Sequence, residues 1–289
     1  MIIIKRYILV HEHLSICLEN EKVYKYNFNN TQLVIDKLNL AQQKGLVDIV
    51  DLTNSTMGCS WKTLKTIQDG TDLNIHYCVG MYKDPYLPNL KNKSIDDILE
   101  RISQEMDECN EQLGYLPIVC GEIGTSLNHF TNNEKKVFEA CTILSKKYKL
   151  PIVTHTTLST CASEQINFLV SNDISPNKIL ISHMDLSNDS NYLINILNKG
   201  VYIGFDTFGK ERYKTDLERI EMLKNLLFKG YEDQICLSTD ITETEELERM
   251  GYTYIIDSVV PKLEEAGLTN IQIDKLIYKN SYSFLYDQR

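Results

Sequence analysis

The stretch Tyr7-Ile8-Leu9-Val10-His11-Glu12-His13 decides between two α/β folds, an open doubly wound sheet and a closed barrel, both of which fit the rest of the chain. Its four leading apolar residues predict a short buried strand. In an open doubly wound sheet, a dinucleotide site usually follows the first strand as a G-x-G-x-x-G turn. Here His-Glu-His stands in that place and the glycine motif is absent. The stretch therefore favours an α/β fold of the (β/α)8 TIM-barrel type.

Short strand-like runs alternate with longer amphipathic runs along the whole chain, which is typical of repeated βα units and a parallel sheet. The expected strands are Tyr7–Val10, Val47–Leu52, Asn74–Val79, Leu116–Cys120, Ile152–Thr154, Lys178–Ser182, Val201–Phe205 and Ile235–Ser238. Eight strands are what a closed barrel requires, and a chain of 289 residues suits one such domain.

Helices are expected between these strands. They are predicted at Thr31–Lys44, Ser94–Gln112, Asn133–Tyr148, Cys161–Ser171, Tyr192–Lys199, Tyr213–Lys229 and Tyr254–Ala266. Ser94-x-x-Asp97 is an N-cap signature, and Gly45 is a usual residue just past a helix end. The segment from Ile271 to Leu285 is expected to pack on the barrel exterior as a C-terminal helical extension. No linker rich in Pro, Gly or Ser divides the chain, so residues 1–289 are predicted to form a single domain.

Composition narrows the classes of partner. The chain has 30 basic and 40 acidic residues, a net charge of −10, which gives no basic footprint for nucleic acid or anionic lipid. Its apolar N-terminal run is short and interrupted by Lys5 and Arg6, unlike a signal peptide, and no apolar run is long enough to span a membrane. Eight cysteines without a C-x-x-C pair are typical of reduced thiols. We expect a cytoplasmic protein with a small-molecule substrate.

Six residues that can bind a metal ion follow expected strands. They are His11, His13, Glu122, His155, His183 and Asp240. Strand ends converge on one face of a barrel, so these side chains should meet there. Each of them alone has an ordinary structural explanation, such as a helix N-cap for Asp240, and the joint pattern is what favours a metal site.

The spacing of the first two histidines adds to this argument. His11 and His13 lie two apart on an extended segment and should point to the same side, with Glu12 pointing away toward a supporting role. Imidazole and carboxylate suit zinc, and two ions about 3.5–4 Å apart can share a hydroxide. We therefore predict two divalent ions, with zinc as the expected metal. His76 lies within a strand and is interpreted as structural, and His129 is left unassigned.

The motifs at the strand ends resemble the phosphotriesterase family of the amidohydrolase superfamily, and most of all its branch of phosphotriesterase homology proteins. The matching motifs are His11-Glu12-His13, Gly80-Met81-Tyr82, Cys120-Gly121-Glu122-Ile123-Gly124, Thr154-His155-Thr156, Ser182-His183-Met184-Asp185, Gly204-Phe205-Asp206 and Ser238-Thr239-Asp240. They occur in order over essentially the whole chain.

The resemblance implies a (β/α)8 barrel with a binuclear metal centre. It implies that His11, His13 and Asp240 hold the more buried ion and that His155 and His183 hold the more exposed one. Residue 122 would bridge the two. Many members of the family use a carboxylated lysine as the bridge, whereas this chain and the branch it resembles have glutamate there. Activities known in the family include hydrolysis of phosphotriesters, lactones and phosphorylated sugar lactones.

These observations predict a lactone or ester hydrolase in which a hydroxide between the ions attacks and Asp240 orients it and carries its proton. Tyr82, Lys210 and Arg249 are the expected substrate contacts, with Tyr252 close to the last of these. The acidic run Glu243–Glu246 should repel a phosphate, so a phosphorylated sugar lactone is the alternative substrate.

Two other interpretations remain open. One is a mononuclear hydrolase of the same superfamily that acts on amides or deaminates bases, against which the bridging position of Glu122 argues. Another is a metal-binding sensor without turnover, against which the complete ligand set argues. The assembly expected from relatives is a homodimer.

Overall fold

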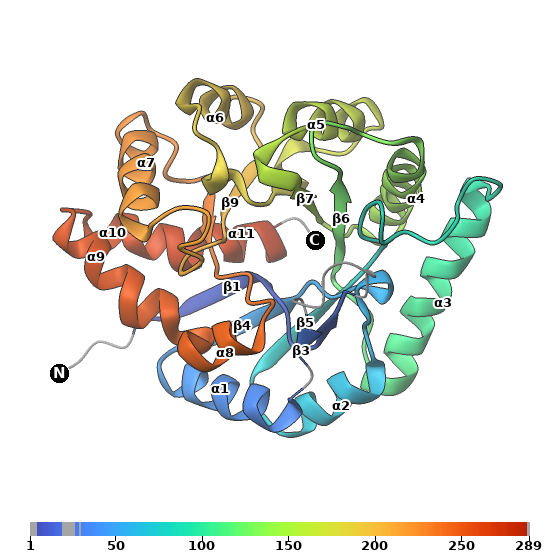
Figure 1. Cartoon of the computed structure of the whole chain (residues 1–289), viewed down its shortest axis with the longest axis horizontal. Coiled ribbons are helices and arrows are strands. Elements are labelled where there is room, and N and C mark those ends of the chain that lie inside the picture. The colour runs from blue at the N-terminus through green and yellow to red at the C-terminus, as the bar shows by residue number, and fades with distance from the viewer. Residues whose placement is uncertain (1–4, 19–26, 29, 288–289) are drawn as a thin grey trace.

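A computed structural model describes residues 5–18, 27–28 and 30–287. Eight parallel strands form one sheet in sequence order, with helices around it in a TIM-barrel arrangement (Figure 1). The strands are β1 (Tyr7–Glu12), β4 (Leu46–Asp51), β5 (Asn74–Val79), β6 (Val119–Thr125), β7 (Ile152–Thr156), β8 (Ile179–Ile181), β9 (Tyr202–Phe205) and β10 (Ile235–Leu237). β2 (Ile16–Cys17) and β3 (Asn27–Phe28) form a separate antiparallel pair. The predicted fold is confirmed.

Helices connect consecutive strands and continue beyond β10. They are α1 (Thr31–Gln43), α2 (Trp61–Asp69), α3 (Ile95–Leu113), α4 (Asn132–Tyr148), α5 (Ala162–Ser171), α6 (Ser190–Leu197), α7 (Asp216–Phe228), α8 (Thr244–Arg249), α9 (Val260–Glu265), α10 (Asn270–Asp274) and α11 (Asn280–Tyr286). Two π-helical turns, Ile255–Val259 and Lys275–Lys279, lead into α9 and α11. Among the described residues, no helix has the length and apolar character needed to cross a bilayer.

The differences from the predicted elements have local causes. The prediction missed α2, although Leu64 and Ile67 are buried on one face of it, and it missed α8, whose six residues are too few for a clear apolar period. Strand β6 begins at Val119 rather than Leu116, because Pro117 lacks the N–H that pairing needs. Helix α7 begins at Asp216 rather than Tyr213, because Thr215 forms a capping box with Glu218.

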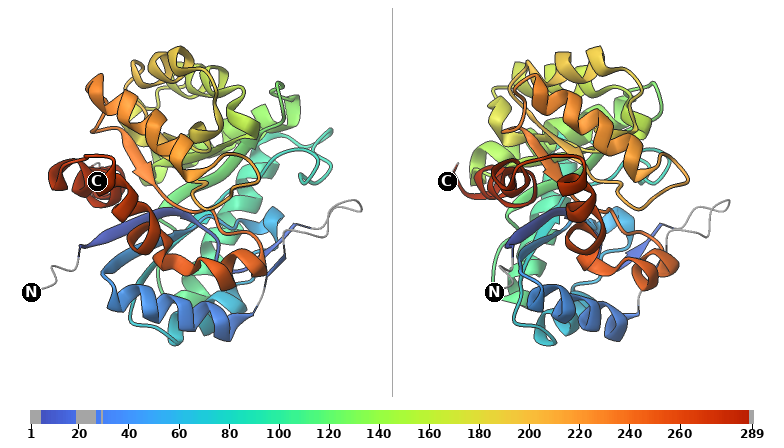
Figure 2. Two further views of the ribbon diagram at one scale, coloured as in Figure 1. Left: turned by 60° about the vertical axis from the view of Figure 1, so that its left-hand side comes forward. Right: turned by 90° about the vertical axis from the view of Figure 1, so that its left-hand side faces the viewer.

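The inside of the barrel is a small apolar core that the C-terminal helix closes. Its residues are Ile8, Val10, Val50, Leu52, Cys78, Val119, Val153, Leu180, Cys236, Phe284 and Leu285. Phe284 lies against Tyr202 at the start of β9, and Asn280 donates to the carbonyl oxygen of Ile235 at the start of β10. Helix α11 therefore covers the N-terminal end of the barrel (Figure 2, dark red) rather than packing only on its exterior as predicted.

Two strands carry an extra residue just before the rim. In β1, Leu9 pairs with Ile49 of β4 and Glu12 pairs with Asp51, so an advance of three residues along β1 matches an advance of two along β4. Along β6, Cys120 and Ile123 are likewise three steps apart, and their partners on β7 are two apart. Such a bulge shifts the in–out alternation of the side chains that follow. It turns His11 and Glu122 into the barrel mouth, where strict alternation from the core residues Val10 and Val119 would turn them outward.

We expect the closure by α11 to carry much of the stability. Phe284→Ala should lower the free energy of unfolding by about 3–5 kcal/mol, because it leaves a cavity under the barrel core. Denaturant titration would measure this. Phe228→Ala is the matched control, because that ring is 94% exposed and its loss should change stability by less than about 0.5 kcal/mol. Equal effects of the two substitutions would contradict the role given to α11.

Candidate metal centre

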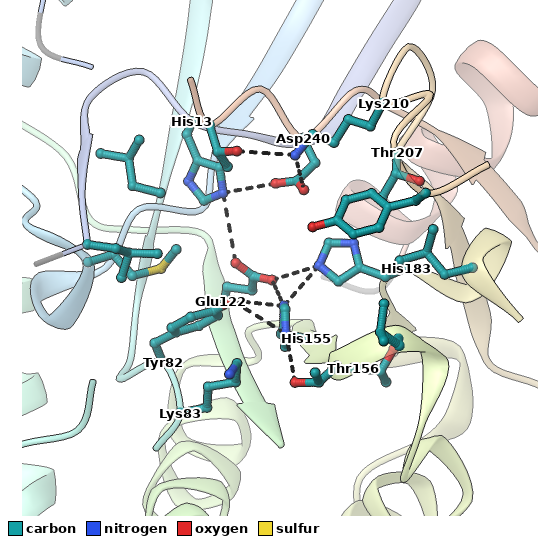
Figure 3. Close-up of a pocket in the computed structure, with 18 of the residues that line it drawn as sticks. His13, Tyr82, Lys83, Glu122, His155, Thr156, His183, Thr207, Lys210 and Asp240 are labelled. Atoms are coloured by element: carbon teal, nitrogen blue, oxygen red, sulfur yellow. Dashed lines mark hydrogen bonds and ion pairs between the residues drawn. The ribbon is translucent and has the colours of Figure 1, made fainter. Parts of the chain in front are cut away.

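The six predicted ligands converge at the C-terminal mouth of the barrel (Figure 3). The structure brings them together in two groups. One is His11, His13 and Asp240, and the other is Glu122, His155 and His183. Within each group the ligand-type atoms lie within 4.8 Å of one another. All six are buried except His155, which is partly exposed. Two adjacent groups of three are the arrangement that a binuclear site needs.

The backbone bends sharply where two of these residues leave their strands. His183 and Asp240 have φ angles of 61° and 47°, in the left-handed region that side chains other than glycine seldom adopt. Such a conformation costs on the order of 1–2 kcal/mol per residue and is often found at functional sites. This backbone conformation destabilises the fold, so it indicates that His183 and Asp240 serve a function at these positions.

Hydrogen bonds on the Nδ1 side orient three of the imidazole rings. Asp206 accepts from Nδ1 of both His11 and His183, each at 2.9 Å. Nδ1 of His13 lies 2.9 Å from the hydroxyl oxygen of Thr53. His11, His183 and Asp206 also form a group of ligand-type atoms within 4.8 Å of one another. These atoms are close because Asp206 is hydrogen-bonded to both rings, so the group needs no third ion to explain it. With Nδ1 engaged, each ring is left with Nε2 to bind an ion.

The Nε2 atoms face the carboxylates of the two groups. His13 Nε2 is 3.3 Å and His11 Nε2 is 3.6 Å from Oδ1 of Asp240. His183 Nε2 is 3.3 Å from Oε1 of Glu122. His155 is turned the other way, with Nδ1 2.9 Å from Glu122 and Nε2 3.3 Å from the Thr157 hydroxyl. The ligand atom of His155 would therefore be Nδ1.

The surroundings of one buried nitrogen atom, Nε2 of His11, indicate whether metal ions fit these residues. His11 Nε2 is buried and makes no hydrogen bond to any residue that the structure describes. An unpaired polar atom in the interior is costly, and an ion between His11, His13 and Asp240 would satisfy it. The donors are imidazole nitrogens and carboxylate oxygens, the set that zinc and neighbouring divalent metals prefer. The residues fit two divalent ions.

The carboxylates make the site strongly attractive to cations. Burial would raise the pKa of Glu122, but the histidines, His11 foremost, hold it well below its usual range. Burial would lower the pKa of His11, yet Glu122 and Asp206 raise it to about 10. Burial lowers the pKa of His155 to about 4. Protons and metal ions therefore compete for the same nitrogens, and metal binding should release protons.

Lys210 is held at the site by Asp240. Its ammonium donates to Oδ2 of Asp240 at 2.6 Å and lies 3.9 Å from Glu246. Burial opposes its charge, but these two carboxylates raise its pKa. Oδ2 of Asp240 is thus engaged by the lysine, and Oδ1 faces the histidines. A contact between Lys210 and substrate stays a prediction.

The other predicted substrate contacts lie in different places. Tyr82 lines the pocket, and its hydroxyl oxygen is 3.1 Å from Nδ1 of His155. Arg249 is not among the lining residues, and its guanidinium donates to the carbonyl oxygen of Gly209. Tyr252 is buried and donates to the backbone oxygen of His13. Only Tyr82 of these three lines the pocket.

Sequence reasoning did not assign a role to Asp206, although it follows a strand as the ligands do. The strand-end rule that selected the six ligands could have selected it as well. Glu12 has the supporting role expected of it. Its carboxylate accepts from the backbone N–H groups of Thr239 and Ile241 and from the Thr239 hydroxyl, and so holds β1 to the segment after β10.

The pocket above the six residues is small. It encloses about 200 Å³, below the roughly 300–1,000 Å³ typical of sites for drug-sized ligands. Its apolar wall consists of Ile16, Leu18, Met57, Tyr86, Leu158, Leu186 and Tyr213. The pocket suits a compact substrate that is partly apolar.

Comparisons with known proteins agree with this geometry. The model of the "Phosphotriesterase family" matches residues 5–285. The phosphotriesterase homology protein of Escherichia coli (strain K12) is 28% identical over 289 aligned residues, covering 96% of this chain and 97% of that protein. Its crystal structure with phosphate in the active site has a TM-score of 0.92 and 27% identity, covering 98% of this chain and 99% of that one.

Two further proteins are similar to this chain over most of its length. N-acetyltaurine hydrolase of Xenopus tropicalis is 27% identical, covering 88% of this chain and 77% of that protein. A lactonase from Listeria monocytogenes has a TM-score of 0.85 at 22% identity, covering 99% of this chain and 96% of that one. At that identity the likeness shows the fold alone.

We expect Asp206→Asn to weaken metal binding by roughly 10- to 100-fold, because an asparagine amide can accept from only one of the two imidazoles. Competition with a chelator of known affinity would measure this. The control is Asp173→Asn, an exposed carboxylate outside the pocket. Unchanged zinc affinity in the Asp206 variant would show that this contact does not position the ligands.

Proposed function

Because this chain belongs to the Phosphotriesterase family of metal-dependent hydrolases, we propose that it hydrolyses a small lactone or carboxylic ester with two divalent ions, zinc being the expected metal. The proposed ligands are His11, His13, Glu122, His155, His183 and Asp240. The observation that carries the proposal is the pair of ligand groups at one barrel mouth, linked by a single carboxylate.

That carboxylate is Glu122. Its Oε1 lies 2.9 Å from His155 and 3.3 Å from His183, in its own group. The same oxygen is 3.5 Å from His11, and Oε2 is 3.9 Å from His13, in the other group. One side chain therefore reaches both groups, which supports a bridging role. It also argues against the mononuclear alternative.

The residues around the centre suggest how the reaction proceeds. Divalent ions bound there would lower the pKa of water and polarise a substrate oxygen. Asp240 is positioned to orient the attacking water through Oδ1, to take its proton and to pass it to the leaving group, while Lys210 holds the carboxylate in place through Oδ2. Tyr82 is positioned to donate a hydrogen bond to the oxygen on which negative charge develops.

The contacts after β10 favour an unphosphorylated substrate. Arg212 lies 2.8 Å from Glu246 and 3.1 Å from Glu243, and Lys210 is paired with Asp240. Cations that could bind a phosphate there already have carboxylate partners. The small pocket also disfavours a bulky phosphotriester. A phosphorylated sugar lactone remains the alternative substrate.

The first test is a hydrolysis screen on zinc-loaded protein with a pH indicator. The panel contains plain lactones, phosphorylated sugar lactones, carboxylic esters and one phosphotriester, with one N-acyl amide followed by the release of its amine instead, because amide hydrolysis releases no net proton near neutral pH. We expect turnover of a lactone or ester that a chelator removes and added zinc restores. Metal-loaded protein that is silent on the whole panel would instead favour the metal-binding sensor.

We expect Asp240→Asn to reduce turnover by roughly 10²- to 10⁴-fold, because asparagine cannot accept the proton. Asparagine tolerates the left-handed backbone, so the fold should be retained. Circular dichroism and zinc content would check this alongside kcat. Asp72→Asn, at an exposed position, is the control. Full activity in the Asp240 variant would remove this residue from the mechanism.

A further inference from the structure

Three cations line the pocket, and they differ in their partners. Lys210 is paired with Asp240, and Arg212 is paired with Glu243 and Glu246. Lys83 has no carboxylate oxygen within 4 Å of Nζ in the part of the chain that the structure describes. Its ammonium donates to the carbonyl oxygen of Asp84 in a long contact of 3.5 Å. Lys83 is therefore the pocket cation whose charge is not neutralised by an ion pair among those residues.

Aromatic contacts hold the Lys83 ammonium at the pocket wall. Nζ is 5.4 Å from the ring centre of Tyr82 and 5.7 Å from that of Tyr86, distances at which a cation is attracted to a ring. Lys83 is half-buried. Burial lowers its pKa, while the negative charges of Glu134, Glu122 and Asp84 oppose this shift. The ammonium is thus partly removed from water without receiving a counter-ion.

The position of Lys83 relates it to the proposed metal centre. It follows Tyr82, whose hydroxyl contacts His155. Figure 3 shows Lys83 beside Tyr82, across Glu122 and His155 from Lys210. Because Lys83, Glu122 and His155 line the same pocket of about 200 Å³, a molecule bound there can contact both the proposed metal centre and Lys83. A partly desolvated ammonium gains most from a charged oxygen acceptor.

We propose that Lys83 is a specificity-determining residue that binds an anionic group of the substrate, attached a few atoms from the bond that is cleaved. The shared chemistry is a small oxyanion, which a carboxylate, a sulfonate or a phosphate can supply. This inference rests on the proposed hydrolase function and narrows its substrate class from lactones and esters in general to anionic ones.

The test uses two substrates of nearly equal shape, a γ-butyrolactone that carries a carboxylate and the same lactone with a carboxamide. Lys83→Met should raise KM for the carboxylate lactone about tenfold, with kcat changed less than about twofold, and leave the carboxamide unaffected. Lys83→Arg should restore most of the affinity because it keeps the charge. Lys62→Met, an exposed lysine outside the pocket, is the matched control.

Inhibition by simple anions identifies which oxyanion Lys83 prefers. Acetate, ethanesulfonate and methyl phosphate can each also bind the metal centre, but Lys83→Met leaves that contribution in place. The anion whose inhibition constant rises most in the variant is the one that Lys83 binds. Equal inhibition constants in wild type and variant for all three anions would overturn the inference.

The two proposals fail in distinguishable ways. Chelator-sensitive turnover of both lactones with the same KM in wild type and Lys83→Met would overturn the role of Lys83 and leave the hydrolase function standing. If neither lactone is turned over, calorimetric titration of zinc-loaded protein with glutarate replaces the kinetic test. Binding about tenfold weaker in Lys83→Met would support the anion site without the hydrolase function, and equal binding would overturn it.

Discussion

The contact between the first and last strands of the barrel is the interaction on which the site depends. The Glu12 carboxylate accepts from the backbone N–H of Thr239 at 2.7 Å and of Ile241 at 3.2 Å, and the Asp240 N–H donates to the carbonyl oxygen of His11. Burial raises the pKa of Glu12 to about 7, and its hydrogen bonds offset part of that desolvation. This closure makes neighbours of groups more than 200 positions apart in the chain, and it places Asp240 beside the two histidines of β1.

A second constraint acts on the imidazoles. A histidine ring has two nitrogens, and a hydrogen bond at one directs the lone pair of the other. Asp206 performs this role for both His11 and His183, and so couples one ring of each ligand group to a single carboxylate. The two proposed metal positions therefore share Asp206 behind them and Glu122 between them. That arrangement accounts for the buried Nε2 of His11, which makes no hydrogen bond within the described part of the chain and would bind an ion.

Charge is distributed unevenly around the pocket. On the side of β10, Lys210 and Arg212 are neutralised by Asp240, Glu243 and Glu246. On the side of the segment after β5, Lys83 rests on aromatic rings instead of a carboxylate. Anion binding is thus favoured on the side away from the acidic run, within a chain whose net charge is −10. A chain-wide charge does not describe the field that a small substrate meets inside a buried mouth.

Local pattern was enough to predict the eight strands and the six ligand types, because apolar periodicity and strand-end placement are properties of a few adjacent residues. Local pattern was not enough to predict which way the side chains of these residues point. The extra residues in β1 and β6, which turn His11 and Glu122 inward, appear only when strand is matched to strand. The partners of Lys210 and the closure of the barrel by α11 likewise join segments 30 to more than 200 residues apart. Such contacts depend on how elements pack, and no local period in the sequence records them.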